Sequence, residues 1–308
     1  MNVAITRILN ILGDVKIVDK IVNLNSSDIN SFLLSVFQSA VIKKTPQNIL
    51  AAFSTNRFTS PSHFDPIAFH NLEVKLLSLS EKLGIKNLLL SPSAPLGSCS
   101  VFGCVNQNNV ISALRGTETL SDPSNMIAII IADGLKKKIL RNEDAIHYAT
   151  TTRVVRAQAF EGKGFYAHFG IFCIVSSGKD KGSYSCESEL LIKHLNYYKD
   201  LFTNIENSKI SICLRKRGGY PDRDGFFEKM TAIVKSSLPE IQITIDLNSE
   251  DNAYYKGINF KIYLHCNDDV IEIADGGFVN WISEMTGNKK NRCLISGIGI
   301  DRLLTLEE

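Results

Sequence analysis

Hydrophobic positions recur with two different periods along the chain. In residues 1–53 the apolar side chains follow the helical period, and a polar stretch around Asn25 divides them into two groups. These groups are Ile8, Leu12 and Val15, then Ile29, Phe32, Leu33 and Phe37. We therefore expect two or three helices in this part. The same period predicts one more amphipathic helix over 67–83, ending at Gly84.

Short apolar runs that alternate with polar residues follow Gly84, as in half-buried strands. The predicted strands are 87–90, 110–114, 170–176, 209–214, 241–246, 258–265 and 270–274, and the intervening helices are 123–139, 187–203 and 224–237. A Cys-Asn-Asp-Asp turn joins the last two strands, which predicts an antiparallel hairpin. Because strands outnumber helices and often follow one another directly, the expected fold class is α+β. We expect a mostly antiparallel sheet flanked by helices, with a small N-terminal helical segment.

A domain boundary is expected near residue 55. The stretch 58–66 contains Pro61, Pro66 and several turn residues, so it interrupts the helical pattern. We expect an N-terminal helical segment over 1–55 and a larger domain over 56–308. With 308 residues, 44% of them hydrophobic, the chain has enough apolar side chains to fill such a core.

Charge and cysteine content disfavour a protein that binds nucleic acid or an anionic membrane, and one held together by disulfides or structural zinc. The 34 Lys and Arg residues nearly balance the 32 Asp and Glu residues, so no polybasic field indicates nucleic acid or an anionic membrane. Arg7, Asp14 and Lys16 interrupt the first apolar stretch, which excludes a signal peptide or membrane span there and predicts a cytoplasmic protein. The 7 cysteines are scattered without a Cys-x-x-Cys pair, which favours reduced thiols over disulfides or structural zinc.

The stretch 152–172 is predicted to form a strand, a loop containing Gly162 and Gly164, and a second strand. The donors that this arrangement brings together are Arg153, Arg156, Lys163 and His168. Cationic and imidazole donors beside a flexible loop suit a polyphosphate, and Phe172 offers an aromatic face for a base. A hairpin with a solvated basic face has the same composition, so both interpretations stay open at this point.

The stretch 294–304 places Gly297 and Gly299 just before Asp301 and Arg302. Glycines allow a strand to pass close to a ligand or to turn tightly into a helix, and Arg302 on the first turn would then face the same cavity. The stretch is neither a Walker loop nor a dinucleotide fingerprint, because the required lysine and third glycine are missing.

In this order and separation, the two stretches resemble the second and third motifs of the class II aminoacyl-tRNA synthetases, in particular their histidyl branch. The second motif reads Arg156-x-Gln158, a loop, then His168-x-x-x-Phe172, and the third reads Gly297-x-Gly299-x-Asp301-Arg302. The first motif is looser, running from Gly84 to Pro92. The resemblance covers roughly 56–308 and implies a catalytic domain of that class.

Three further segments resemble the histidyl branch, and the resemblance places them around the substrate. The substrate-binding residues that it implies are Asp122, Ser124, Tyr254, Tyr255, Lys256, Gly276 and Gly277. It implies ATP and Mg²⁺ as cofactors, and a homodimer formed through the first motif. Glu272 is the candidate magnesium ligand, with an exposed strand glutamate as the alternative interpretation.

The resemblance also implies a role for each motif residue. The ATP-binding set is Arg156, Gln158, His168, Phe172, Gly297, Gly299, Asp301 and Arg302, of which Arg156 and Arg302 are the catalytic pair. Arg156 would contact the α-phosphate, His168 and Arg302 the terminal phosphates, and Gln158 the adenine edge or the acceptor. The ring of Phe172 would stack on adenine.

Some positions depart from the family pattern. Glu250 stands where the histidyl branch has an arginine, and Lys261 stands where it has a strand carboxylate. We therefore expect that histidine is not the preferred substrate and that Lys256 or Lys261 helps to hold the substrate. The sequence ends six residues after Arg302, so no anticodon-binding domain is expected.

Two functions fit these features, and a third fits less well. The first is ATP-dependent activation of an amino acid or related carboxylate as an acyl-adenylate, with transfer to an unknown acceptor: a tRNA, a protein or a small molecule. The second is a non-catalytic regulatory subunit like the histidyl-synthetase-like subunit of ATP phosphoribosyltransferase. A pure RNA-binding or scaffolding module is the third, which the near-neutral charge disfavours.

Overall fold

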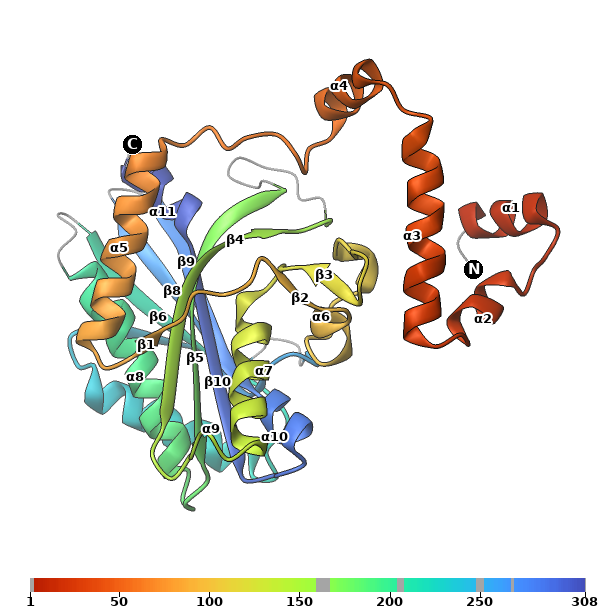
Figure 1. The fold of residues 1–308 in the computed structure, drawn as a ribbon. Helices are drawn as coiled ribbons and strands as arrows, with labels where there is room; N and C mark the ends of the chain where they lie inside the picture. The colour runs from red at the N-terminus through yellow and green to blue at the C-terminus, as the bar shows by residue number, and fades with distance from the viewer. Residues whose placement is uncertain (1–2, 159–166, 204–207, 248–251, 267–268, 308) are drawn as a thin grey trace.

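The computed structural model describes residues 3–158, 167–203, 208–247, 252–266 and 269–307. These residues form an eight-stranded sheet in the order β1-β4-β5-β10-β9-β8-β6-β7 (Figure 1). Its strands are β1 (Lys86–Asn87), β4 (Ile146–Val155), β5 (His168–Lys179), β6 (Ser208–Lys216), β7 (Gln242–Asp246), β8 (Lys256–Cys266), β9 (Asp269–Val279) and β10 (Asn291–Gly299). All neighbouring pairs from β4 to β6 are antiparallel, while β1 and β7 join the two edges in parallel. The predicted mostly antiparallel α+β sheet is confirmed.

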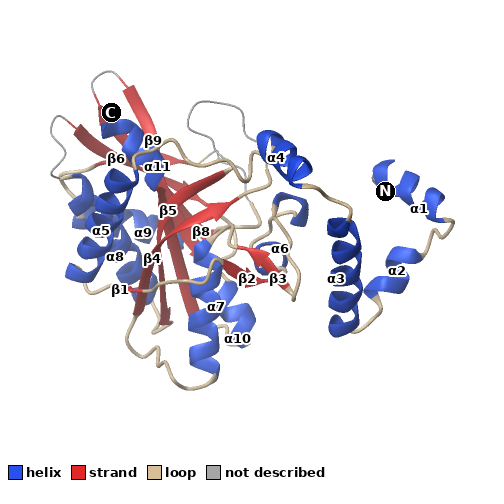
Figure 2. Cartoon of the chain, turned by 45° about the horizontal axis from the view of Figure 1, so that its top comes forward, coloured by secondary structure: helices blue, strands red, loops and turns tan. Residues whose placement is uncertain are grey.

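Helices cover both faces of this sheet (Figure 2). The helices packed on one face are α5 (Pro66–Lys82), α8 (Ser185–Phe202), α9 (Arg223–Ser237) and α11 (Ile300–Glu307), and those on the other are α7 (Pro123–Lys136) and α10 (Trp281–Thr286). Consecutive residues of a strand point to opposite faces. Phe172 and Ile174 of β5 therefore join the first core, while Cys173 and Val175 join the second.

Most sequence-predicted elements are found within a few residues of their expected bounds. The hairpin of β8 and β9 is antiparallel, as predicted. The predicted strand 110–114 is wrong, because this segment follows a short 3₁₀ turn, η1 (Gln107–Asn109), and makes only one bridge, from Ser112 to Glu118. Helix α6 (Ser98–Val101) and the small sheet of β2 (Ser93–Pro95) and β3 (Thr117–Thr119) complete this region.

Four helices occupy the N-terminal part, where two or three were expected: α1 (Val3–Leu12), α2 (Ile17–Val22), α3 (Ser26–Ile42) and α4 (Pro46–Thr55). Local capping divides them. Gly13 ends α1 with a φ of +68°, and Thr45 begins α4 with a capping box. They extend away from the sheet (Figures 1 and 2) and expose large apolar side chains, including Ile11 and Ile42. Within the described residues, no helix is both long and apolar enough to span a membrane.

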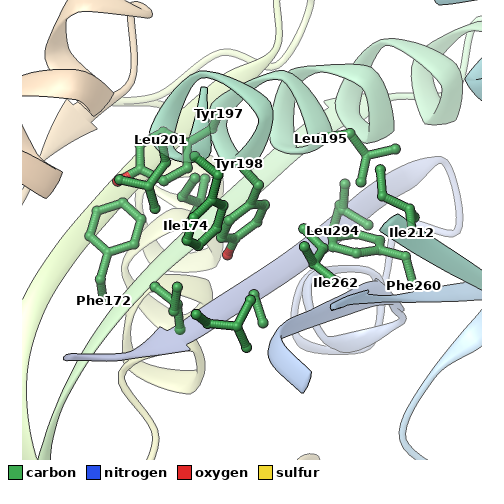
Figure 3. Close-up of a cluster of buried hydrophobic side chains, with 14 of the residues drawn as sticks. Phe172, Ile174, Leu195, Tyr197, Tyr198, Leu201, Ile212, Phe260, Ile262 and Leu294 are labelled. Atoms are coloured by element: carbon green, nitrogen blue, oxygen red, sulfur yellow. The ribbon is translucent and has the colours of Figure 1, made fainter. Parts of the chain in front are cut away.

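The largest core cluster includes side chains of α8 and of the strands β5, β10, β8 and β6 (Figure 3). The ring of Phe172 is fully buried and stacks on Tyr197 of α8, with ring centroids 4.9 Å apart. The hydroxyl of Tyr197 donates to the carbonyl oxygen of Leu76 in α5 at 3.0 Å. Phe172 thus joins the sheet to the helices that cover it.

A buried chain of polar side chains also joins these layers. The Ser176 hydroxyl lies 2.7 Å from His147 Nδ1 and 2.7 Å from His194 Nε2, and His194 Nδ1 lies 2.8 Å from the Ser296 hydroxyl. Burial lowers the pKa of His147 to about 4 and lowers the pKa of His194 well below its usual value. Both imidazoles are therefore neutral at pH 7.

We expect Phe172→Ala to lower the free energy of unfolding by about 3–5 kcal/mol, because it empties a site in a packed core. Phe172→Leu should lower the free energy of unfolding by less than Phe172→Ala does. Urea unfolding measures both variants, with Phe37→Ala on the exposed part of α3 as the control. A loss below about 1 kcal/mol for Phe172→Ala would contradict this placement of the ring.

Stability should decrease as the pH falls from 7 to 5. The unfolded chain takes up a proton at each histidine near pH 6.5, whereas His147 in the folded chain does so only near pH 4. His147→Gln should therefore lose less stability over this interval than the unmodified chain, by about 1–2 kcal/mol. Urea unfolding at both pH values measures this difference. An equal loss in His147→Gln and in the unmodified chain would refute the assignment.

Candidate functional site

A cavity of about 350 Å³ lies on the sheet face that carries α7 and α10. Its floor is formed by side chains of the central strands, including Ile171 of β5 and Ile295 of β10. The remaining wall comes from the start of α7, the segment after β4 and the residues that precede β8. The cavity has the size of a small-molecule site and draws on segments far apart in the sequence.

The start of α7 places Asp122 in the cavity wall. Its Oδ1 accepts from the backbone N–H and the hydroxyl of Ser124, at 2.9 and 2.6 Å, which caps the helix. Its Oδ2 accepts from the hydroxyl of Tyr254 at 3.1 Å. Burial raises the pKa of Tyr254 well above its usual value, so this hydroxyl remains a neutral donor.

A second pair of the same kind stands beside the first. Asp275 Oδ2 of β9 accepts from the hydroxyl of Tyr255 at 3.0 Å, and the rings of Tyr254 and Tyr255 meet edge to face at 4.8 Å. Burial raises the pKa of Asp275. Gly277 makes room for this arrangement, because a Cβ there would lie 2.6 Å from Tyr255 Cδ1. Gly276 packs against Phe260 on the opposite face, where a Cβ would likewise find no space.

Arg156 follows β4 and lies at the cavity wall with Gln158. Its Nε donates to the carbonyl oxygen of Ser121 at 3.1 Å, and its Cζ lies 5.0 Å from the centroid of the Phe169 ring. The sequence motifs do not single out Phe169. The alternation of β5 indicates it, because Phe169 lies two residues before the cavity residue Ile171 and therefore points to the same face.

The structure does not bring Phe172 and His168 to the cavity. Both have the parity of the opposite face, where Phe172 is fully buried against Tyr197 and has no ring face free for a base. His168 Nδ1 accepts from Arg153 Nη2 at 2.7 Å, and its Nε2 lies 2.5 Å from the Ser60 carbonyl oxygen. The expected adenine stacking by Phe172 is therefore corrected, and His168 holds the segment before α5.

The third-motif residues divide between the two faces in the same way. Gly297 lines the cavity, whereas Asp301 is buried on the opposite face and accepts from the Gly170 backbone N–H at 2.7 Å. Burial raises the pKa of Asp301. Asp301 thus anchors α11 to β5 and does not face the cavity. Gly299 ends β10 just before the helix, and a Cβ there would meet Arg302 Cβ at 3.5 Å.

Arg302 is exposed on the first turn of α11, outside the cavity lining. Its Nη1 donates to the backbone carbonyl oxygen of Glu272 at 2.7 Å. The side chain of Glu272 pairs with Lys261 Nζ at 2.6 Å. Lys256 Nζ donates to the carbonyl oxygen of Ala253 at 2.9 Å and lies outside the cavity lining. The loop residues Gly162, Lys163 and Gly164, and Glu250 with its expected effect on substrate charge, lie outside the described residues.

Two thiols line the cavity, Cys99 and Cys173. Burial raises the pKa of Cys99 to about 12 and raises the pKa of Cys173 well above its usual value, so both remain neutral. Among the described residues, no group of three or more His, Cys, Asp and Glu side chains could hold a metal ion.

Comparison with known proteins places this arrangement in a known fold. The sequence matches no protein-family model and no curated protein. The apo histidyl-tRNA synthetase of S. aureus is similar in structure, with a TM-score of 0.58 and 14% identity over 79% of this chain and 65% of that one. A Bacillus halodurans C protein described as an ATP phosphoribosyltransferase regulatory subunit/histidyl-tRNA synthetase gives a TM-score of 0.56 and 15% identity, over 81% and 82%.

A threonyl-tRNA synthetase structure shares the same architecture. The RNA binding domain of threonyl-tRNA synthetase from Cryptosporidium parvum Iowa II gives a TM-score of 0.61 and 10% identity, over 77% of this chain and 63% of that one. The chain thus spans less than two thirds of the S. aureus and C. parvum proteins. From its antiparallel sheet, its flanking helices and these likenesses, the chain has the class II aminoacyl-tRNA synthetase fold.

Proposed function

We propose that this protein is a cytoplasmic ATP-dependent ligase that activates an amino acid or related carboxylate as an acyl-adenylate and transfers it to an acceptor. Arg156 carries the proposal. Its Nε is fixed by the Ser121 carbonyl oxygen, and the described residues offer no hydrogen-bond partner to its other two nitrogens. A guanidinium fixed at its Nε beside a cavity of this size is suited to neutralise a phosphate next to a small bound acid.

In this reaction a carboxylate oxygen of the substrate attacks the α-phosphorus of ATP. The bond from that phosphorus to the bridging oxygen breaks, and pyrophosphate leaves with the electron pair. The nucleophile is already ionised at neutral pH, so the protein has to supply positioning and charge neutralisation and needs no general base. The neutral cavity thiols are consistent with this chemistry.

Each nucleotide contact can be assigned to a residue that is not fully buried. Arg156 faces the α-phosphate, and Phe169, beside its guanidinium, takes the adenine ring in place of Phe172. Gln158 is exposed at the cavity and meets the adenine edge or the acceptor. Arg302 has only Nη1 engaged among the described residues, so its remaining N–H groups serve the terminal phosphates.

Magnesium does not fit the described residues well. Glu272, the candidate ligand, is already paired with Lys261 at 2.6 Å, and a carboxylate neutralised by a lysine has less attraction for a divalent cation. We assign no residue of the described chain to magnesium.

A non-catalytic regulatory role is the second candidate function. The observation that favours it is the state of the motif residues on the far face: His168 is engaged by Arg153 and Ser60, and so is not available for phosphate. The B. halodurans protein with the same fold is described both as a regulatory subunit and as a synthetase. The fold alone therefore fits both roles.

A homodimer is the proposed assembly, formed through α5 and the segment after it. This surface exposes Ile67, Val74 and Leu89, with Leu89 98% exposed. An isologous contact of such apolar side chains around a two-fold axis would bury all of them. The acceptor is a tRNA, a protein or a small molecule.

Pyrophosphate exchange over the amino acids tests the proposed activity. We expect radioactive ATP to form with at least one acid, and Arg156→Ala to lower that rate at least about 100-fold because it removes a phosphate contact in the transition state. Arg302→Ala should weaken ATP binding about tenfold in calorimetry. The exposed Arg141→Ala is the control. Exchange with none of the acids would refute the ligase and favour the regulatory function.

Light scattering tests the dimer. The full chain should have twice the mass of one 34.2 kDa chain at micromolar concentration. Leu89→Asp should shift it to the monomer, because a buried unpaired carboxylate opposes association. Ile139→Asp, at an exposed site beyond α7, should leave the dimer intact. A monomeric mass for the unmodified chain would show that this surface does not associate.

A further inference from the structure

The charges around the cavity do not balance. Among its described lining residues, the charged side chains are Asp122, Asp275 and Arg156. Two carboxylates therefore face one guanidinium. The other polar side chains of the lining, such as Ser124 and Asn109, carry no charge.

Neither carboxylate has a cationic partner in the described part of the chain. Asp122 accepts only from Ser124 and Tyr254, and Asp275 accepts only from Tyr255. These donors are neutral, so they orient the carboxylates without cancelling their charge. Lys261, which lies on the strand beside Asp275, makes its ion pair with Glu272, and its Coulombic effect on the pKa of Asp275 is smaller than the effect of burial. A partly buried, oriented and uncompensated carboxylate is costly for a protein unless a ligand supplies the opposite charge.

We propose that the substrate is an amino acid with a second cationic group, an ammonium or guanidinium, at the end of its side chain. This inference rests on the proposed function, because it takes the cavity as the substrate site. The two cationic groups lie against Asp122 and Asp275, and the substrate carboxylate lies toward Arg156. The charges of the substrate and the cavity then cancel.

The shape and lining of the cavity agree with such a substrate. A volume of about 350 Å³ is at the lower end for ligand sites and suits one amino acid. Ile171, Ile295 and Val110 provide apolar surface for the methylene groups between the two charged ends. A neutral side chain of equal length would leave one carboxylate unpaired, and such an unpaired group discriminates strongly between similar ligands.

Calorimetry with matched pairs of probes tests the inference on the full chain. The pairs are lysine with norleucine, ornithine with norvaline, and arginine with citrulline, each differing mainly in the terminal charge. At least one basic amino acid should bind about tenfold or more tightly than its neutral partner at pH 7.5. In Asp275→Asn, which keeps the shape and the acceptor for Tyr255, this ratio should fall to near one. Asp133→Asn, on the exposed side of α7, should keep the ratio of the unmodified chain.

The outcomes separate this inference from the proposed activity. A basic preference that depends on Asp275 supports it even if pyrophosphate exchange is absent, a result that would refute only the ligase. Exchange that is faster with a neutral amino acid than with every basic one keeps the ligase and overturns the inference. Equal binding within each pair, an unchanged ratio in Asp275→Asn, or no binding of any probe also overturns it.

Discussion

Coverage of the sheet on both faces is the constraint on which the site depends. Strand β5 lies between the helices α5, α8 and α11 on one side and α7 with the cavity on the other. Each of its side chains must therefore enter the core or the cavity, and a shift by one residue would exchange the two sets. The register is fixed by pairing with β10, where Gly297 faces Cys173, and by the Asp301 carboxylate on the Gly170 backbone. Core packing and site geometry are thus two results of one alignment.

The same constraint explains how one short motif serves two purposes. In the second motif, Arg156 and Phe169 reach the cavity side, while His168 and Phe172 are held on the core side. In the third motif, Gly297 reaches the cavity and Asp301 the core. Residues that resemble one functional signature therefore divide into those that can meet a ligand and those that hold the strands in place. A motif match shows which residue types are present. The alternation of side chains along the strand then decides which face of the sheet each residue occupies.

The side of the cavity that carries Tyr254 and Tyr255 depends on contacts between distant segments. Tyr254 and Tyr255 are neighbours in the chain, yet one reaches the start of α7 and the other reaches β9. Each tyrosine orients a carboxylate, and neither neutralises it. Fold likeness to synthetases and to a regulatory subunit leaves the function open between them, because both share the scaffold. The charge of this cavity comes from the side chains of this chain and not from the shared backbone, and so it is the better guide to what the protein binds.

The sequence by itself determined the secondary structure of the sheet and its covering helices. Alternation and helical spacing are local properties, so the hairpin of β8 and β9 and the helices α5, α7, α8 and α9 could be predicted. It also identified Arg156, Asp122 and the tyrosine pair as candidates, and all of them line the cavity. It missed the division at α4 because Thr45 and Pro46 form a cap within a few residues, a signal that the hydrophobic period does not contain.

Only the tertiary structure decided which face of β5 holds the cavity. Phe169 and Phe172 are both aromatic residues on one predicted strand, and alternation shows that they point to opposite faces without showing which face is which. The packing of Tyr197 against Phe172 settles this choice, and Tyr197 lies on a helix that follows the strand. The pairing of Asp275 with Tyr255, and of Glu272 with Lys261, likewise depends on the register of β8 against β9 and its bulge. No local sequence pattern indicates that these residues are close to one another. Burial on two faces and strand register are properties of the assembled sheet.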